Sequence, residues 1–297
     1  MFWPTRSPVV PLQELGWVNT SYLATANARC DPTIVWGTQF CIEPLEQFVH
    51  EQRRQTGTMI STAHVLLRAV AEALQRHPLV NRRVIGRRVY PYDGVHLTMP
   101  MLETRSGEVN IVYLQHAERM SLAEIARRIW EEARNVAVRT ATAEKRKQSE
   151  TVWQRMTRLW SAWFRIHWVH RMAGVGFWVT NRLRLPTLTL HEINGTSAFV
   201  NHLGFAGAPP MIAYKPSSLP TNSFGVSVTL GTAEKQAVVD GSAVVIRTMA
   251  PLFVRVDHRL VNGYQTAAFI STLRTLLEQP GQLAASTQDP HAARTAA

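Results

Sequence analysis

The amino-acid sequence predicts an α/β fold, an α+β sandwich in which helices flank a mixed β-sheet. Helix-like and strand-like segments are interspersed along the chain, and several of the strand-like segments occur in hairpin-like pairs. Elements distributed in this way pack as layers around one core. The chain of 297 residues can bury a large core, and we expect a single domain over residues 1–280. Residues 281–297 carry little apolar bulk and are predicted to be a disordered tail.

The first half of this domain contains two predicted helices around a β-region. Residues 33–36 and 38–42 are extended stretches that precede it. The first helix has apolar residues at helical spacing on one face, namely Leu66, Leu67, Val70 and Leu74. Residues 121–124 have the Ser-x-x-Glu spacing of a capping box, so the second helix begins there. Residues 94–102 and 108–115 lie between the helices and are predicted strands.

The C-terminal part of the domain is predicted to be a strand, a turn and a helix. Residues 251–256 are rich in β-branched and aromatic side chains, which favours a strand. Asn262 and Gly263 indicate a turn, because both residues tolerate positive φ. Apolar residues then recur at helical spacing from Tyr264, and Pro280 ends this helix.

One titratable side chain, His258, stands at the corner between this strand and this helix. It is flanked by Asp257 and Arg259. A neutral imidazole with a pKa of about 6.5 is the natural general base near pH 7, and a corner of this kind can direct it into a cleft. On these residues alone, a structural histidine in a polar corner is the simpler interpretation.

Residues 257–263 resemble the Asp-His-Arg-x-x-Asp-Gly signature of the dihydrolipoyl acyltransferase components of 2-oxo acid dehydrogenase complexes. The catalytic domain of that family is related to chloramphenicol acetyltransferase. Further segments resemble the family in the same order, namely residues 69–74, 78–81, 120–126, 195–196, 201–204 and 238–247. The resemblance covers about residues 30–280 and implies a chloramphenicol acetyltransferase-like fold, here in a stand-alone form without a lipoyl domain.

The resemblance implies a CoA-dependent acyltransferase. In this family a histidine deprotonates the thiol of coenzyme A, and the thiolate attacks an acyl thioester; His258 matches that base. A serine or threonine normally donates a hydrogen bond to the oxyanion, worth about 3 kcal/mol. Its position falls at Asn201, with His202 as a neighbouring substitute, and Asn262 stands where the family usually has aspartate. The expected catalytic residues are therefore His258, Asn262 and Asn201, no cofactor-binding residue is identified, and the implied assembly is a homotrimer or a multiple of trimers.

Two departures from the family leave the reaction open. Asn201 and Asn262 replace the usual serine or threonine and the usual aspartate. The sequence has no lipoyl-lysine module, so we expect no lipoyl attachment site, and the donor is either a separate lipoyl-bearing protein or acyl-CoA. In the second case the acceptor is a small hydroxyl or amine. The alternative hypothesis is a catalytically weak homologue that acts as a structural or assembly core.

Residues 145–186 fit neither the family pattern, which has a short connection here, nor an ordinary linker. On a helical wheel one side carries Trp153, Met156, Trp160, Trp163, Phe164 and His167. The opposite side carries Arg155, Arg158 and Arg165. We expect a basic amphipathic insertion. It packs on the domain or on a neighbouring subunit, lies at a membrane interface, or fills a groove on a partner.

Composition restricts the remaining function classes. The net charge of +11 favours an anionic partner such as nucleic acid, a membrane surface or a phosphorylated cofactor, for which coenzyme A qualifies. The absence of zinc-finger spacing and of an aromatic RNA-binding motif argues against nucleic acid. Cys30 and Cys41 form neither a disulfide scaffold nor a metal cluster, so we expect no metal and a reducing compartment. Without a secretory signal or a long apolar run, the expected location is cytoplasmic, with peripheral membrane contact through residues 145–186 as an option.

Overall fold

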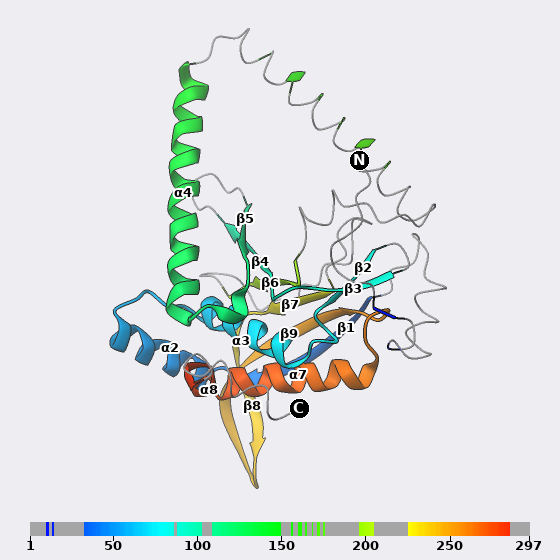
Figure 1. Ribbon diagram of the computed structural model, residues 1–297. Coiled ribbons are helices and arrows are strands. Elements are labelled where there is room, and N and C mark those ends of the chain that lie inside the picture. The colour runs from blue at the N-terminus through cyan, green and yellow to red at the C-terminus, as the bar shows by residue number, and fades with distance from the viewer. Residues whose placement is uncertain are drawn as a thin grey trace.

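A seven-stranded mixed sheet forms the centre of the protein in the computed structural model (Figure 1). The structure describes residues 10–11, 14, 33–85, 88–102, 109–149, 196–204 and 225–285, and positions 156, 160, 161, 164, 168, 171, 172 and 175. The strand order is β1-β9-β7-β6-β4-β5, and β8 lies off this path, where it pairs with the first half of β9. Helices flank the sheet, so the predicted fold class is confirmed.

The sheet combines parallel and antiparallel pairs. Its strands are β1 (Thr33–Cys41), β4 (Leu97–Leu102), β5 (Val109–Leu114), β6 (Ala198–His202), β7 (Val226–Leu230), β8 (Glu234–Asp240) and β9 (Ala243–Asp257). The β4–β6 and β6–β7 pairs are parallel, and the remaining pairs are antiparallel. A separate two-stranded sheet consists of β2 (Arg82–Ile85) and β3 (Arg88–Pro91).

The helices bury their apolar faces against this sheet and against one another. They are α2 (Glu43–Thr56), α3 (Thr62–Arg76), α4 (Leu122–Ser149), α7 (Gly263–Glu278) and α8 (Gly281–Ala285), with a 3₁₀ turn η1 (Ala117–Arg119). α3 contacts both α7 and β6, and α7 contacts β1. All four apolar residues predicted to line α3 are fully buried, as is Phe269 of α7. The sheet contributes alternate residues such as Leu252 and Val254 to the same core.

Local signals in the sequence placed several helix ends correctly. The capping box at α4 is present, because the Ser121 N–H donates to Glu124 Oε2 and the Glu124 N–H donates to Ser121 Oγ. Helix α7 ends at Glu278, just before Pro280, as predicted. Residues 281–285 correct the expected tail: they form α8, because Leu283 is buried against the core. Residues 286–297 lie outside the described part of the chain.

One row of paired residues crosses five strands and defines an edge of the sheet. It runs through Val256, Val226, Ala198, Leu97 and Leu114, each paired with the next. β5 ends at this row, β9 ends one residue beyond it, and β7, β6 and β4 begin at it. Residues that come directly before or after these strands therefore gather at the same edge, although they are far apart in the sequence.

We expect the histidine in the first turn of α3 to make the protein acid-sensitive. Burial, aided by the charge of Arg53, lowers the pKa of His64 from 6.5 to about 4. Since the unfolded chain takes up a proton at the higher pKa, the free energy of unfolding falls as the pH drops from 6.5 to 4, by about 3 kcal/mol. His64→Gln removes this titration and can still accept the Ser61 N–H that Nδ1 now accepts. Urea denaturation at pH 7, 5.5 and 4 should give a shallower pH dependence for the variant; parallel curves would contradict the prediction.

Candidate active site

His258 stands in a turn that its two neighbours hold in place. Asp257 is buried at the end of β9. Its Oδ1 accepts the Arg259 backbone N–H at 3.0 Å and Nε at 2.9 Å, and its Oδ2 accepts Nε and Nη2 of the same guanidinium. This Asp257–Arg259 clamp fixes the backbone on both sides of His258. The imidazole itself is half-buried.

The same turn lies directly on the start of β7. The Asp257 N–H donates to the Gly225 carbonyl at 3.0 Å. A Cβ at position 225 would lie 2.5 Å from the Arg82 carbonyl oxygen and 3.1 Å from Leu260 Cδ1. Position 225 therefore admits only glycine without a backbone shift. This close approach packs the start of β7 against the turn that carries His258.

Asn262 has a clear structural role as the N-cap of α7. Its Oδ1 accepts the Gln265 N–H at 3.0 Å, and Gln265 Oε1 accepts the Asn262 N–H at 3.0 Å. Asparagine and aspartate are equally good residues for this position, so the asparagine found here preserves the cap. The helix consequently begins at Gly263, five residues after His258.

Asn201 and His258 are far apart along the strand direction of the sheet. It pairs with Thr229 of β7, which pairs with Phe253 of β9. Phe253 is four residues before Asp257, which is about 13 Å along a strand, and β6 is two strands from β9, about 10 Å across the sheet. One chain therefore does not bring Asn201 and His258 together. His202 is next to Asn201, and burial lowers its pKa, which favours the neutral imidazole.

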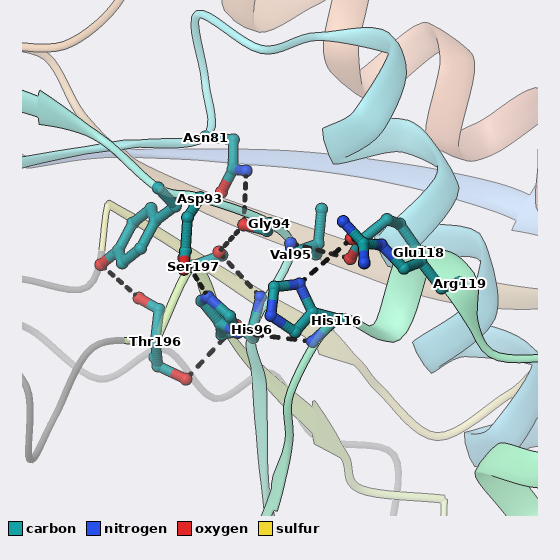
Figure 2. Close-up of polar contacts among 11 residues, drawn as sticks. Asn81, Asp93, Gly94, Val95, His96, His116, Glu118, Arg119, Thr196 and Ser197 are labelled. Atoms are coloured by element: carbon teal, nitrogen blue, oxygen red, sulfur yellow. Dashed lines mark hydrogen bonds and ion pairs between the residues drawn. The ribbon is translucent and has the colours of Figure 1, made fainter. Parts of the chain in front are cut away.

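Beside the ends of β4 and β5 at this sheet edge lies a second polar group, which the sequence did not predict. Figure 2 shows its side chains. Asp93 and His96 precede β4, and His116 follows β5. One ligand-type atom from each of the three side chains lies within 4.8 Å of the others. The only local signal in the sequence is the short Asp93-x-x-His96 spacing, because His116 joins them through the β4–β5 pairing.

The predicted insertion is only partly described. Trp153, Trp163, His167 and the three arginines Arg155, Arg158 and Arg165 lie outside the described residues. The described positions 156, 160, 164, 168, 172 and 175 are helical, and their large apolar side chains are exposed. Among the helices that the structure describes, none is both long enough and apolar enough to cross a membrane.

Comparisons with known proteins agree on one family. Residues 30–151 and 179–285 match the 2-oxoacid dehydrogenases acyltransferase (catalytic domain) family, and the unmatched stretch between them falls within the predicted insertion. The dihydrolipoyllysine-residue acetyltransferase component of the acetoin cleaving system of Bacillus subtilis (strain 168) is 26% identical over 227 residues. That alignment covers 76% of this chain and 44% of the relative, so the chain spans less than half of the relative's length.

Solved structures share the fold. A dihydrolipoamide acetyltransferase of Azotobacter vinelandii, investigated for the catalytic roles of a serine, a histidine and an asparagine, superposes with a TM-score of 0.57 at 18% identity. The alignment covers 95% of this chain and 94% of that one. The cubic core of a pyruvate dehydrogenase multienzyme complex gives a TM-score of 0.56 at 19% identity, with the same coverage. With its fold and most of its length matched, this chain belongs to the family of 2-oxoacid dehydrogenase acyltransferase catalytic domains.

Proposed function

We propose that this acyltransferase domain moves an acyl group between a thioester and coenzyme A, with His258 as the general base. The observation that carries the proposal is the presentation of His258 by the Asp257–Arg259 clamp at the end of β9. The histidine and asparagine studied in the Azotobacter vinelandii enzyme are four positions apart, as are His258 and Asn262. Asn262 acts on the reaction indirectly, because it fixes the start of the helix that follows the turn.

The proposed reaction requires one base and one hydrogen-bond donor from this chain. His258 takes the proton from the thiol of coenzyme A, and the thiolate adds to the carbonyl carbon of an acyl thioester held by a lipoyl group outside this domain. Asn201 donates an amide N–H to the oxyanion that forms, with the neutral His202 beside it as a second possible donor. Collapse breaks the bond to the lipoyl sulfur, which takes up the proton from His258. The products are acyl-CoA and dihydrolipoamide, so atoms and protons balance.

The distance between Asn201 and His258 in one chain supports a site shared by two copies. We propose a homotrimer in which Asn201 of one copy faces His258 of the next. The β8–β9 hairpin projects from the body of the molecule (Figure 1). One face of it carries Val239, Val244 and Ile246, all exposed in the single chain. An apolar face on a projecting arm is suited to burial against a second copy.

Complementation between two inactive variants tests the base, the donor and the shared site together. His258→Ala and Asn201→Ala are each purified and assayed for acetyl transfer between acetyl-CoA and dihydrolipoamide, and the two are then co-expressed. We expect each variant to be impaired and the mixed assembly to regain activity, because some sites receive an intact residue from each copy. Activity in none of the samples, wild type included, would favour the assembly-core hypothesis. If the mixed assembly shows only the residual activity of the two separate variants, both residues act within one copy.

A separate observation favours a membrane surface as a further partner. The exposed apolar residues that the structure describes in the insertion are spaced by four, four, four, four and three positions, the spacing expected for one face of a helix. They are Met156, Trp160, Phe164, Trp168, Met172 and Val175. Residues 145–186 contain nine lysines and arginines and a single acidic residue, Glu150. Tryptophan with basic residues is the composition of helices that lie in an anionic membrane interface.

Vesicle co-sedimentation distinguishes this partner from the other interpretations of the insertion. We expect the full chain to sediment with phosphatidylcholine–phosphatidylglycerol vesicles and less with phosphatidylcholine alone. Replacing Trp160 and Trp168 with serine should abolish the binding and leave acetyl transfer unchanged. Binding that survives in this variant would exclude the insertion as the contact, and loss of trimers in the variant would indicate a subunit interface instead.

A further inference from the structure

We propose that Asp93, His96 and His116 form a binding site for a divalent transition-metal ion. Two imidazoles and one carboxylate are a common ligand set for zinc and for iron, cobalt and nickel. One ligand atom from each residue lies within 4.8 Å of the others, which a small movement can close around one ion. The carboxylate can make that movement, because the Asp93 side chain is 78% exposed.

The backbone holds His116 toward this point in an unfavourable conformation. His116 has φ 50° and ψ 46° and is the only non-glycine residue with positive φ in the described part of the chain. Such a conformation is unfavourable for a side chain with a Cβ and persists only where the surroundings enforce it. Two hydrogen bonds to Val95 enforce it here: the Ala117 N–H donates to the Val95 carbonyl, and the Val95 N–H donates to Glu118 Oε2.

Gly94 and Glu118 shape the space around the His116 ring. A Cβ on Gly94 would lie 2.3 Å from His116 Nδ1, so only a glycine lets the ring reach its position. Nδ1 is buried without a hydrogen-bond partner, although Glu118 Oε1 is 3.4 Å away. With Nδ1 on the buried side, Nε2 is the nitrogen available to an ion. Metal binding at Nε2 would place the proton on Nδ1, where Glu118 can accept it, and a carboxylate behind a metal-bound histidine is a frequent arrangement.

His96 sets the energetic cost of the site. Its Nε2 lies 2.7 Å from Asp93 Oδ1, and its Nδ1 accepts the His116 backbone N–H at 3.4 Å. The proton is therefore on Nε2 when no ion is bound. An ion displaces it, and the neutral ring then carries its proton on Nδ1 and gives up the 3.4 Å contact. Because that hydrogen bond is long, its loss is a small penalty, and binding should weaken as the pH falls.

The site is independent of the proposed acyl transfer. It lies at the same sheet edge as His258, but three strand spacings separate β4 from β9, about 14 Å. A negative result in the metal-binding test would therefore leave the proposed acyl transfer intact. A negative result in the acyl-transfer assay would likewise leave the metal site intact.

Cobalt(II) titration of the metal-depleted 297-residue chain tests the site, because bound Co²⁺ has visible absorption that reports its ligands. We expect one saturable equivalent whose spectrum Zn²⁺ abolishes by competition. Asp93→Asn and His116→Asn should each lose this equivalent; both side chains are partly exposed, and asparagine tolerates positive φ. His50→Asn, on the exposed side of α2, is the matched control and should bind as wild type does.

The melting temperature provides a second measurement. Zn²⁺ should raise it in the wild type and in His50→Asn, and should not raise it in the Asp93→Asn/His116→Asn double variant. No saturable binding by the wild type, or the same Co²⁺ equivalent in the double variant, would overturn the proposal.

Discussion

His258→Ala should reduce acetyl transfer between acetyl-CoA and dihydrolipoamide by about 10²–10⁴-fold, the usual contribution of a positioned general base. The loss should appear in kcat, because the imidazole acts on the proton that moves in the reaction and contributes little to holding the rest of coenzyme A. The half-buried side chain can be truncated with little effect on the core, since the Asp257–Arg259 clamp does not involve the ring.

The matched control for this variant is His50→Ala, which removes an exposed imidazole from α2. It should retain wild-type kcat and KM. Circular dichroism and sedimentation velocity should show the same folded assembly for both variants. Equal activity of His258→Ala and wild type would refute the role of His258 as base, and a loss of activity accompanied by dissociation would assign it a structural role.

Phe269→Ala should lower the free energy of unfolding by about 3–5 kcal/mol, as expected for removing a fully buried aromatic ring. Phe269 lies on the buried face of α7, and its ring meets that of His77 edge-on with centroids 6.0 Å apart. Because α7 begins five residues after His258, loosening this helix should also impair the turn that presents the base.

Tyr264→Ala tests whether the effect comes from burial. It removes an aromatic ring from the first turn of the same helix, but Tyr264 is 85% exposed. We expect a change within about 0.5 kcal/mol, as for ordinary surface positions. Urea midpoints measured at one fixed protein concentration compare the two variants. Equal destabilisation would mean that helix propensity, rather than core packing, controls α7.

Local sequence signals predicted the elements whose ends carry a physical marker. The capping box marked the start of α4, and Pro280 marked the end of α7. The helix α2 was missed because only three of its side chains are buried, and a mostly polar helix has weak apolar periodicity.

The arrangement of the site depends on pairings that no local signal encodes. The signature around His258 could be recognised from adjacent residues. The distance between Asn201 and His258 along the strand direction, however, follows from the register of β6, β7 and β9. The group of Asp93, His96 and His116 likewise exists only because β4 and β5 pair. The sequence therefore identified candidate residues, and the pairing of the strands determines which of them lie close together.

The length of β9 links assembly to chemistry. This strand of 15 residues extends about 50 Å, with the exposed hairpin at its first residues and the turn of His258 directly after its last. If the hairpin packs against a neighbouring copy, the uninterrupted backbone of β9 connects the subunit contact to His258. Quaternary contacts and the position of the imidazole would then be mechanically coupled, and activity per chain should decline on dilution as the copies separate.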